Sequence, residues 1–108
     1  MSSTSPKPGQ IWKVDLGYEG KVRWFVIVSR FDQDAPRALA LAVPVTTQYR
    51  GTPYEVRLGK LPCFREDSYA NTQGLASLRW MDFLTLGGQV PPALFGEIKR
   101  SLRFALEL

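Results

Sequence analysis

Apolar and polar residues alternate near the start of the chain with the period of two that a β-strand produces. In "GQIWKVDLG", residues 9–17, one face is mixed and the other is apolar, and the apolar face holds Trp12, Val14 and Leu16. This alternation predicts a half-buried strand. Residues 22–29 are apolar on both faces and rich in β-branched side chains, which predicts a central strand. The glycines of "GYEG" mark a turn between the two.

Three later segments also have strand character. "ALALAVPVTT", residues 38–47, predicts a third apolar strand, and because Pro44 cannot donate to a ladder, this strand should end, bulge or lie at an edge near there. "YEVRL", residues 54–58, alternates cleanly. "SYANTQGLASL", residues 68–78, predicts one or two short strands interrupted at Gly74. Residues 79–90 are assigned no element.

The period of the pattern changes at the end of the chain, in "PPALFGEIKRSLRFALEL". Apolar side chains recur there at helical spacing and charged side chains occupy the other face. The apolar stripe consists of Leu94, Phe95, Ile98, Leu102, Ala105 and Leu106. The two prolines at its start suit the first turn of a helix. We expect an amphipathic helix whose stripe packs into the core.

These elements predict a mainly β (α+β) fold, a small β-barrel of about 5–7 short strands with a C-terminal amphipathic helix. No helix-length segment separates the early strands, so their pairing should be mostly antiparallel. Residues 1–8, rich in Ser and Pro, are expected to form a flexible tail, and residues 9–108 a single domain. A barrel this small leaves apolar edge surface to cover, which favours a symmetric homodimer.

Composition narrows the chemistry more than the fold. Hydrophobic residues make up 44% and charged residues 22% of the chain, which is too apolar for disorder. The net charge of +4 is compatible with an anionic partner and equally with simple solubility. The chain has no histidine and a single cysteine, Cys63, which excludes Cys–His and Ser–His catalysis and histidine or multi-thiolate metal sites. We therefore expect no metal and no cofactor.

Targeting signals are lacking in the sequence as well. The start "MSSTSPKPG" has no apolar stretch of the kind found in signal peptides. The apolar runs fall far short of the roughly 20 residues that a membrane span needs. A cytoplasmic protein without membrane contact is the expectation.

Four blocks in order, "KPGQIWKVDLG", "RWFVIVS", "VPVTTQ" and "DSYANTQ", followed by the amphipathic helix, resemble the MazF/PemK family. The resemblance runs from about residue 7 to the end. Members of this family are toxins of bacterial toxin–antitoxin pairs. The resemblance implies an SH3-like barrel of the CcdB/MazF/Kid type, a homodimer and a cognate antitoxin as partner. It also implies a metal-independent endoribonuclease that cuts single-stranded RNA.

The resemblance implies a catalytic pair. Arg23 opens the second strand, where the family has its arginine, and Thr46 ends the third strand, where the family has its threonine. Attack by the RNA 2′-hydroxyl gives a cyclic phosphate through a dianionic pentacoordinate phosphate. A guanidinium fork donates two hydrogen bonds to such oxygens, and a threonine hydroxyl adds a neutral donor. The resemblance also implies that Arg23 takes part in proton transfer. Without it, Arg23 is a solvated strand end and Thr46 an ordinary strand residue.

Further residues are candidates for binding RNA. Trp24 either fills the core or an interface, or offers a stacking platform to a base. The loop "TTQYRG" combines side chains that can read base edges and hold phosphate, although a plain hairpin loop has the same composition. The predicted RNA-binding residues are Tyr18, Trp24, Thr47, Gln48, Arg50 and Gln73.

The chain departs from the family pattern at three places. Trp24 stands where the family usually has proline. The loop over residues 17–22 carries one acid, Glu19, whose spacing does not match the family's acidic residue. The block "QGLASL" from Gln73 replaces the pattern Q-[IV]-R-[TS]-[LV]-D. Two alternatives therefore stay open, a non-catalytic barrel that poisons gyrase as CcdB does and a degenerate, inactive MazF-like domain.

Overall fold

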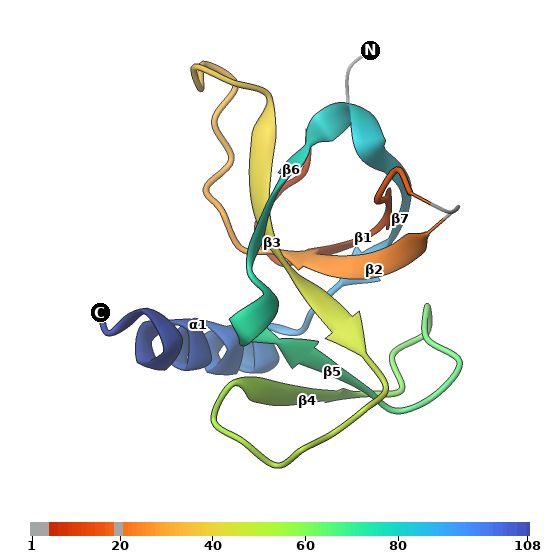
Figure 1. The fold of residues 1–108 in the computed structure, drawn as a ribbon, viewed down its shortest axis with the longest axis vertical. Helices are drawn as coiled ribbons and strands as arrows, with labels where there is room; N and C mark the ends of the chain where they lie inside the picture. The colour runs from red at the N-terminus through yellow and green to blue at the C-terminus, as the bar shows by residue number, and fades with distance from the viewer. Residues whose placement is uncertain (1–4, 19–20) are drawn as a thin grey trace.

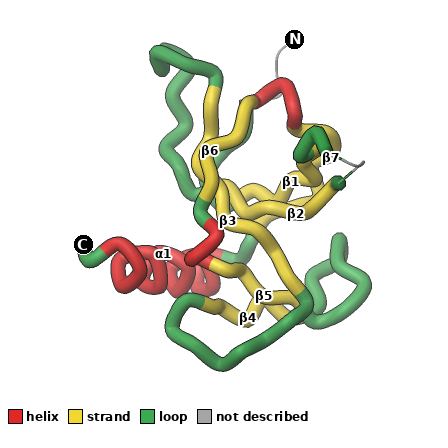
Figure 2. Tube along the Cα trace, viewed as in Figure 1, coloured by secondary structure: helices red, strands yellow, loops and turns green. Residues whose placement is uncertain are grey.

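One bent sheet of seven strands and a C-terminal helix make up the chain in the computed structural model, which describes residues 5–18 and 21–108 (Figure 1). The strands are β1 (Gln10–Asp15), β2 (Val22–Ile27), β3 (Leu39–Thr46), β4 (Glu55–Gly59), β5 (Ser68–Asn71), β6 (Ala76–Arg79) and β7 (Phe83–Gln89). Two 3₁₀ turns, η1 (Thr72–Gly74) and η2 (Trp80–Asp82), and the helix α1 (Pro92–Leu106) complete the order. Long loops join β2 to β3, β3 to β4 and β4 to β5 (Figure 2).

The sheet runs in the order β4-β5-β3-β2-β1-β7, and β6 also pairs with β3. Every ladder is antiparallel, and β2 is a central strand, as the sequence pattern predicts. The mainly β class with a C-terminal helix is confirmed. The SH3-like barrel is open, since no ladder joins β7 to β4 within the described residues. No helix in this part of the chain is both long enough and apolar enough to cross a membrane.

Two apolar clusters lie on opposite faces of β2, which explains its continuous apolar run. Val26 is fully buried in the cluster that α1 covers, together with Ile11, Val43, Val56, Leu58, Phe64, Ala70, Val90 and Ile98. Phe25 and Ile27 face the other cluster, which β6, η2 and β7 cover. Burying one such side chain stabilises the fold by roughly 1.5–3 kcal/mol.

The strand β3 changes its neighbour at Pro44. Up to Ala42, one side of β3 pairs with β6, and from Val45 onward the same strand pairs with β5. The three residues of η1 separate β5 from β6. Because Pro44 has no N–H, it cannot donate a ladder hydrogen bond to the neighbouring strand. The neighbouring strand therefore loses no hydrogen bond from Pro44 where it turns away. Gly74 permits the close approach, because a Cβ there would lie 2.6 Å from Cγ of Pro44. The sequence predicts an irregularity at Pro44 and an interruption at Gly74. In the structure the two occur at the same place, because the turn that contains Gly74 packs against Pro44.

Helix α1 packs Ile98 into the core and half-buries Leu94, Phe95 and Leu102 against it, as the stripe predicts. The prediction was wrong for Leu106, which is 50% exposed because the last turn extends beyond the sheet. A buried polar contact also fixes the helix. The hydroxyls of Thr72 and Ser101 lie 2.7 Å apart. The Thr72 hydroxyl also lies 2.8 Å from the carbonyl of Tyr54, and the Ser101 hydroxyl lies 2.7 Å from that of Pro53. Two hydroxyl hydrogens are thus shared among three contacts, which tie η1 and the β3–β4 loop to α1.

Two expectations about the chain's organisation need comment. The sequence pattern missed β7, because Gly87 and Gly88 interrupt the alternation that marks a strand. The flexible tail stays a prediction: residues 1–4 lie outside the described residues, while Pro6 is buried and Lys7 donates its N–H to the Gln10 side chain at 2.8 Å.

Candidate functional site

Arg23 and Thr46 lie just beyond the last paired residues of β2 and β3. Arg23 is exposed near the start of β2, beside Val14 of β1. The β2–β3 ladder ends at Phe25 and Pro44, and by alternation Arg23 and Thr46, each two residues beyond that last pair, face the same side as it does. Directly opposite residues of antiparallel strands carry their side chains on the same face. The two candidate catalytic residues therefore share one face of the sheet.

The same face continues across two further strands. Thr46 is paired with Tyr69 of β5, and Tyr69 is paired with Arg57 of β4. Thr46, Tyr69 and Arg57 thus form one line of paired residues over β3, β5 and β4. Together with Arg23, which is on the same face of β2, they are called the cross-strand row. Two of its four members are arginines, and both are exposed. The row is a surface suited to anions.

The hydroxyl of Thr46 is oriented by its own loop. Its Oγ1 accepts the backbone N–H of Gln48 at 3.1 Å. This contact uses an oxygen lone pair and leaves the hydroxyl hydrogen for another acceptor. An oriented hydroxyl with its hydrogen available can donate to a phosphate oxygen.

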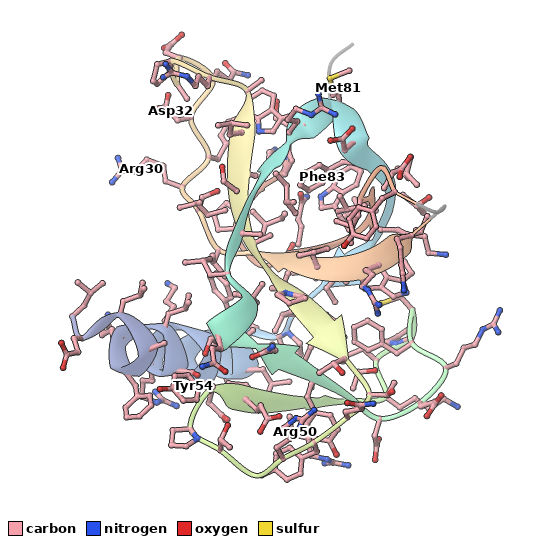
Figure 3. All side chains as sticks on the ribbon, in the orientation of Figure 1. Arg30, Asp32, Arg50, Tyr54, Met81 and Phe83 are labelled. Carbon is pink, nitrogen blue, oxygen red and sulfur yellow. The ribbon has the colours of Figure 1, made fainter. Side chains whose placement is uncertain are left out.

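A polar pocket of about 310 Å³ opens beside Thr46. It collects four of the predicted residues in one place, Thr46, Gln48, Arg50 and Gln73, and its other lining residues are Thr52, Tyr54, Glu55 and Asn71. Arg50 and Tyr54 come from the β3–β4 loop at the end of the molecule away from η2 (Figure 3). Gln73 comes from η1, which is oriented by the Asn71 side chain accepting its N–H at 3.1 Å.

A second pocket, of about 440 Å³, lies on the other side of Thr46 and includes Trp24 and Thr47. Trp24 is packed there rather than free. Its ring meets Phe64 edge to face at 6.2 Å, and Nζ of Lys13 lies 5.1 Å from its centroid. Gly87 leaves space for it, since a Cβ on Gly87 would lie 2.8 Å from Cη2 of the indole. These contacts fit the interpretation of Trp24 as a packing residue, and its stacking role stays a prediction.

Some predicted residues lie outside both pockets. Arg23 lines neither, although alternation places it on the face of Thr46. Tyr18 is 60% exposed in the β1–β2 turn and lines neither pocket. Glu19 lies outside the described residues, as does part of the loop predicted over residues 17–22.

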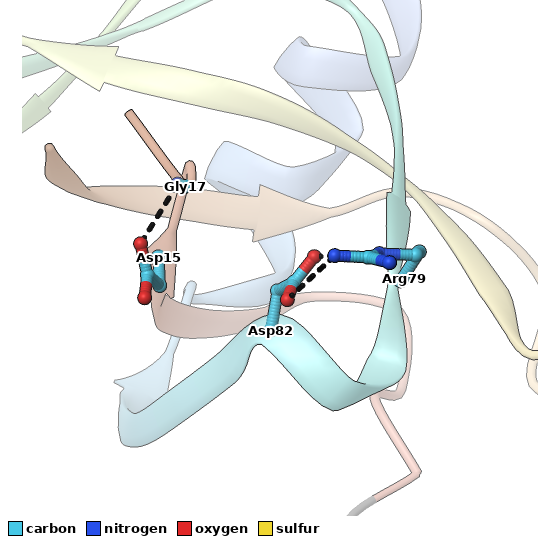
Figure 4. A network of polar contacts seen from close by, with 4 residues as sticks. All are labelled: Asp15, Gly17, Arg79 and Asp82. Carbon is cyan, nitrogen blue, oxygen red and sulfur yellow. Dashed lines mark hydrogen bonds and ion pairs between the residues drawn. The ribbon is translucent and has the colours of Figure 1, made fainter. Parts of the chain in front are cut away.

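Several carboxylates already have a partner, some of them at the far end of the molecule from the site. Asp15 accepts the N–H of Gly17 at 2.8 Å, and on the neighbouring turn Asp82 pairs with Arg79 at 3.0 Å (Figure 4). Asp67 pairs with Arg57 at 3.0 Å. This contact is the main cause that raises the pKa of the Arg57 guanidinium, with a smaller contribution from Tyr69. Among residues 5–18 and 21–108, no three metal-ligating side chains are grouped to hold an ion.

Glu55 fixes the loop that carries Gln48 and Arg50. Its carboxylate accepts the N–H of Arg50 at 3.1 Å and of Thr52 at 3.0 Å, and the Thr52 hydroxyl also at 3.0 Å. The Thr52 N–H is the largest cause that lowers the pKa of this carboxyl, and the Arg50 N–H adds to it against partial desolvation. Charge on Glu55 and order in the loop are therefore coupled.

Several residues of this surface are not among those that the sequence predicts to bind RNA. The sequence treats Arg57 as a solvated residue that could extend a basic surface. Alternation gives a signal for Arg57 and Glu55, since a strand that buries Val56 and Leu58 turns both toward the other face. The alternation of β5 likewise places Tyr69 and Asn71 on one face. What no local pattern could show is that this face aligns with Thr46, because strand register depends on distant segments.

Comparisons with known proteins show the family to which this chain belongs. Residues 7–106 match the family model described as PemK-like, MazF-like toxin of type II toxin-antitoxin system. The chain belongs to this family. The match covers nearly all of the sheet and α1, so the similarity extends over the whole surface described above.

Individual proteins also match this PemK/MazF-family chain over nearly its whole length. Endoribonuclease MazF1 of Mycobacterium bovis and endoribonuclease MazF4 of Mycobacterium tuberculosis are each 32% identical over 104 residues, covering 96% of this chain and 95% of the relative. A mycobacterial endoribonuclease solved in complex with its cognate antitoxin has a TM-score of 0.83 at 30% identity, covering 95% of this chain and 96% of that one. MazF from a MazE–MazF crystal of Deinococcus radiodurans, at 20% identity and a TM-score of 0.78, shares the fold.

Acidification should release the β3–β4 loop. Because the native pKa of Glu55 is lowered, its contribution to loop order is complete above the ordinary glutamate pKa and is lost as pH falls through the lowered native value. Backbone amide shifts of Arg50 and Thr52 should therefore titrate together below the ordinary glutamate pKa. Glu55→Gln should abolish that titration. Titration of both amides at or above the ordinary value would contradict the assignment.

Proposed function

We propose that this chain is the toxin of a toxin–antitoxin pair and cleaves single-stranded RNA at the cross-strand row, with Arg23 and Thr46 as the catalytic pair. Family membership and identity to named endoribonucleases support the toxin and the nuclease parts. The observation that supports the site is that alternation puts Arg23 and Thr46 on one exposed, arginine-bearing face, each two residues beyond the last β2–β3 pair.

The chemistry required is stabilisation of charge at phosphorus. The 2′-hydroxyl attacks the adjacent phosphate, the bond to the 5′-oxygen breaks, and a cyclic phosphate and a free 5′-hydroxyl are left. In this proposal the Arg23 guanidinium holds two phosphate oxygens with its planar fork, and the Thr46 hydroxyl donates to the same group. Donors held in place before the reaction are worth roughly 3–4 kcal/mol each in such sites. Gln48 orients Thr46 for this task.

The two pockets beside Thr46 would bind the RNA on either side of the scissile bond. Gln48, Arg50 and Gln73 line the polar pocket and Thr47 and Trp24 the second one, so RNA crossing Thr46 would meet both sets. We assign Tyr18 the same role from the β1–β2 turn. The catalytic step as proposed uses no metal or cofactor.

Two protein partners belong to the proposal. A cognate antitoxin would cover the basic surface of the row, by analogy with the mycobacterial relative solved with its antitoxin. A second copy of the chain would cover the apolar surface at the end of α1, where Leu41, Leu106 and Leu108 are 44%, 50% and 86% exposed. These residues line one apolar pocket with Val28, Leu75, Lys99, Leu102 and Arg103. We expect the toxin to act in the cytoplasm, where its RNA substrate is found.

The two alternatives find less support. The relatives with 30% identity or more described above are named endoribonucleases and not gyrase poisons. Retention of Arg23 and Thr46 on one face argues against a degenerate domain.

Arg23→Ala should abolish cleavage and leave the fold intact. Purified protein is incubated with a mixed RNA pool in EDTA, and the wild type is expected to cut it. Loss of one such donor lowers the rate by about 10²–10³-fold. Arg30→Ala, which removes an exposed arginine from the β2–β3 loop, is the matched control and should cleave normally.

Circular dichroism and thermal unfolding accompany this test. A folded Arg23→Ala protein that still cuts RNA contradicts the catalytic assignment. An unfolded one shows that Arg23 is structural, which also defeats it. If the wild-type protein leaves the RNA pool uncut but still arrests growth, the nuclease proposal fails and the target is a protein.

The protein should be a homodimer at micromolar concentration. Light scattering should give twice the chain mass of 12.2 kDa for the wild type and the single mass for Leu106→Asp, because a carboxylate is costly to bury in an apolar interface. Met81→Ala, at a residue 77% exposed in η2, should stay dimeric. A wild-type mass near 12.2 kDa would rule out the dimer, and a dimeric Leu106→Asp would place the interface elsewhere.

A further inference from the structure

An aromatic pair lies next to the candidate catalytic threonine. Tyr49 of the β3–β4 loop stacks on Tyr69 of β5, with ring centroids 4.6 Å apart and an interplanar angle of 15°. Tyr69 is the direct ladder partner of Thr46, so one strand spacing, about 4.8 Å, separates their backbones. This tyrosine stack is therefore adjacent to the place where the scissile phosphate would be held.

The outer ring of the stack is accessible. Tyr49 is 59% exposed although its ring is stacked on Tyr69, and Gly51 lies beside it. A Cβ on Gly51 would lie 3.9 Å from Cε2 of Tyr49, so a side chain there would begin in contact with the ring. Glycine leaves that side of the ring uncovered. An aromatic surface is thus presented to solvent beside a polar, basic site.

The backbone on both sides of Tyr49 is also held in place, while the ring itself is held by its stack on Tyr69. Before it, the Gln48 N–H is bound to Thr46 Oγ1 at 3.1 Å. After it, the Glu55 carboxylate binds the N–H groups of Arg50 and Thr52. An aromatic ring fixed before binding loses little conformational freedom when a ligand stacks on it.

The charges around the stack favour a nucleic acid over a hydrophobic protein segment. Arg50 follows Tyr49 in the loop, and Arg57 is paired with Tyr69 across the ladder. The nearby carboxylates of Glu55 and Asp67 are engaged by backbone N–H groups and by Arg57. Because Arg57 is already paired with Asp67, Arg50 is the guanidinium that remains for phosphate, and an aromatic surface beside a cation is a usual means of holding a base and its phosphate in a single strand.

We propose that Tyr49, supported by Tyr69, is a base-stacking subsite for the nucleotide next to the scissile phosphate and so helps to set where this toxin cuts. The inference rests on the proposed RNA cleavage. It adds a residue that contacts substrate but is separate from the catalytic pair. Stacking on an aromatic side chain is worth about 1–3 kcal/mol per base, which corresponds to roughly 5–150-fold in affinity.

The test compares Tyr49→Ala with Tyr49→Phe, which keeps the ring and removes the hydroxyl. Cleavage of an RNA oligonucleotide taken from the wild-type cut sites gives KM and kcat, and sequencing of cleaved ends from a mixed pool gives the base preference. Tyr49→Ala should raise KM about 10-fold with kcat nearly unchanged, and should relax base preference at one position beside the cut. Tyr49→Phe should behave as the wild type. Met81→Ala, which lies at the opposite end of the molecule in Figure 3, is the surface control.

Several results would overturn the subsite. One is an unchanged KM and an unchanged base preference in Tyr49→Ala. Another is an equal rise in KM in Tyr49→Phe and Tyr49→Ala, which would assign the effect to the hydroxyl. A fall in kcat at constant KM would mean that Tyr49 acts through Thr46. Unchanged RNA kinetics with weakened antitoxin binding would assign the stack to the protein partner.

Failure of the proposed function is distinguishable from failure of the subsite. If the wild type cuts no RNA, the cleavage proposal fails, and the subsite is then judged by binding alone. Fluorescence anisotropy with a labelled single-stranded RNA pool should still show weaker binding for Tyr49→Ala than for Tyr49→Phe. Equal affinities of the two variants would overturn the stacking role as well.

Discussion

The functional surface depends on one backbone constraint, the lack of an N–H at Pro44 in the middle of β3. If β3 formed ladder hydrogen bonds along its whole length, β5 and β6 would be a single continuous strand beside it. Because Pro44 cannot donate there, the opposing chain leaves the ladder for the three residues of η1 and rejoins it with a new register. The change aligns Tyr69 with Thr46, and it pushes Gln73 out of the sheet into the polar pocket. Gly74 is required where this turn approaches the proline ring.

The interruption at η1 is stabilised from the side of the helix. Thr72 is 2% exposed and its hydroxyl reaches both Ser101 of α1 and the carbonyl of Tyr54. Buried hydroxyls are costly unless they are bonded, so this contact favours one placement of η1, α1 and the β3–β4 loop over others. The site is thus made of loops and strand ends, yet it is held by buried contacts on one side and by the Glu55 carboxylate on the other. Such support lets exposed residues keep a defined geometry.

The sequence predicted the parts of this structure that depend on local pattern. The alternation around Trp12 and the apolar run at Val26 gave the correct strands and the central position of β2. The helical period at Ile98 gave α1. β7 was missed because its glycines carry no strand signal, and Gly87 is explained only by the indole of Trp24 packed against it. Arg23 and Thr46 were named through the family resemblance, and their common face follows from alternation beyond the last β2–β3 pair, Phe25 and Pro44. Tyr69 entered the site only through ladder pairing, which is a non-local property.

The central claim is that RNA binds along the cross-strand row from Arg23 to Arg57. It is tested most directly by titrating the protein with a single-stranded RNA in which 2′-O-methyl groups block cleavage, while backbone amide shifts are followed by NMR. The account predicts that the largest shifts fall at the start of β2, the end of β3 and along β4 and β5, including Thr46 and Tyr69. Shifts confined to α1, β6 and η2, with Thr46 and Tyr69 unmoved at saturation, would contradict it.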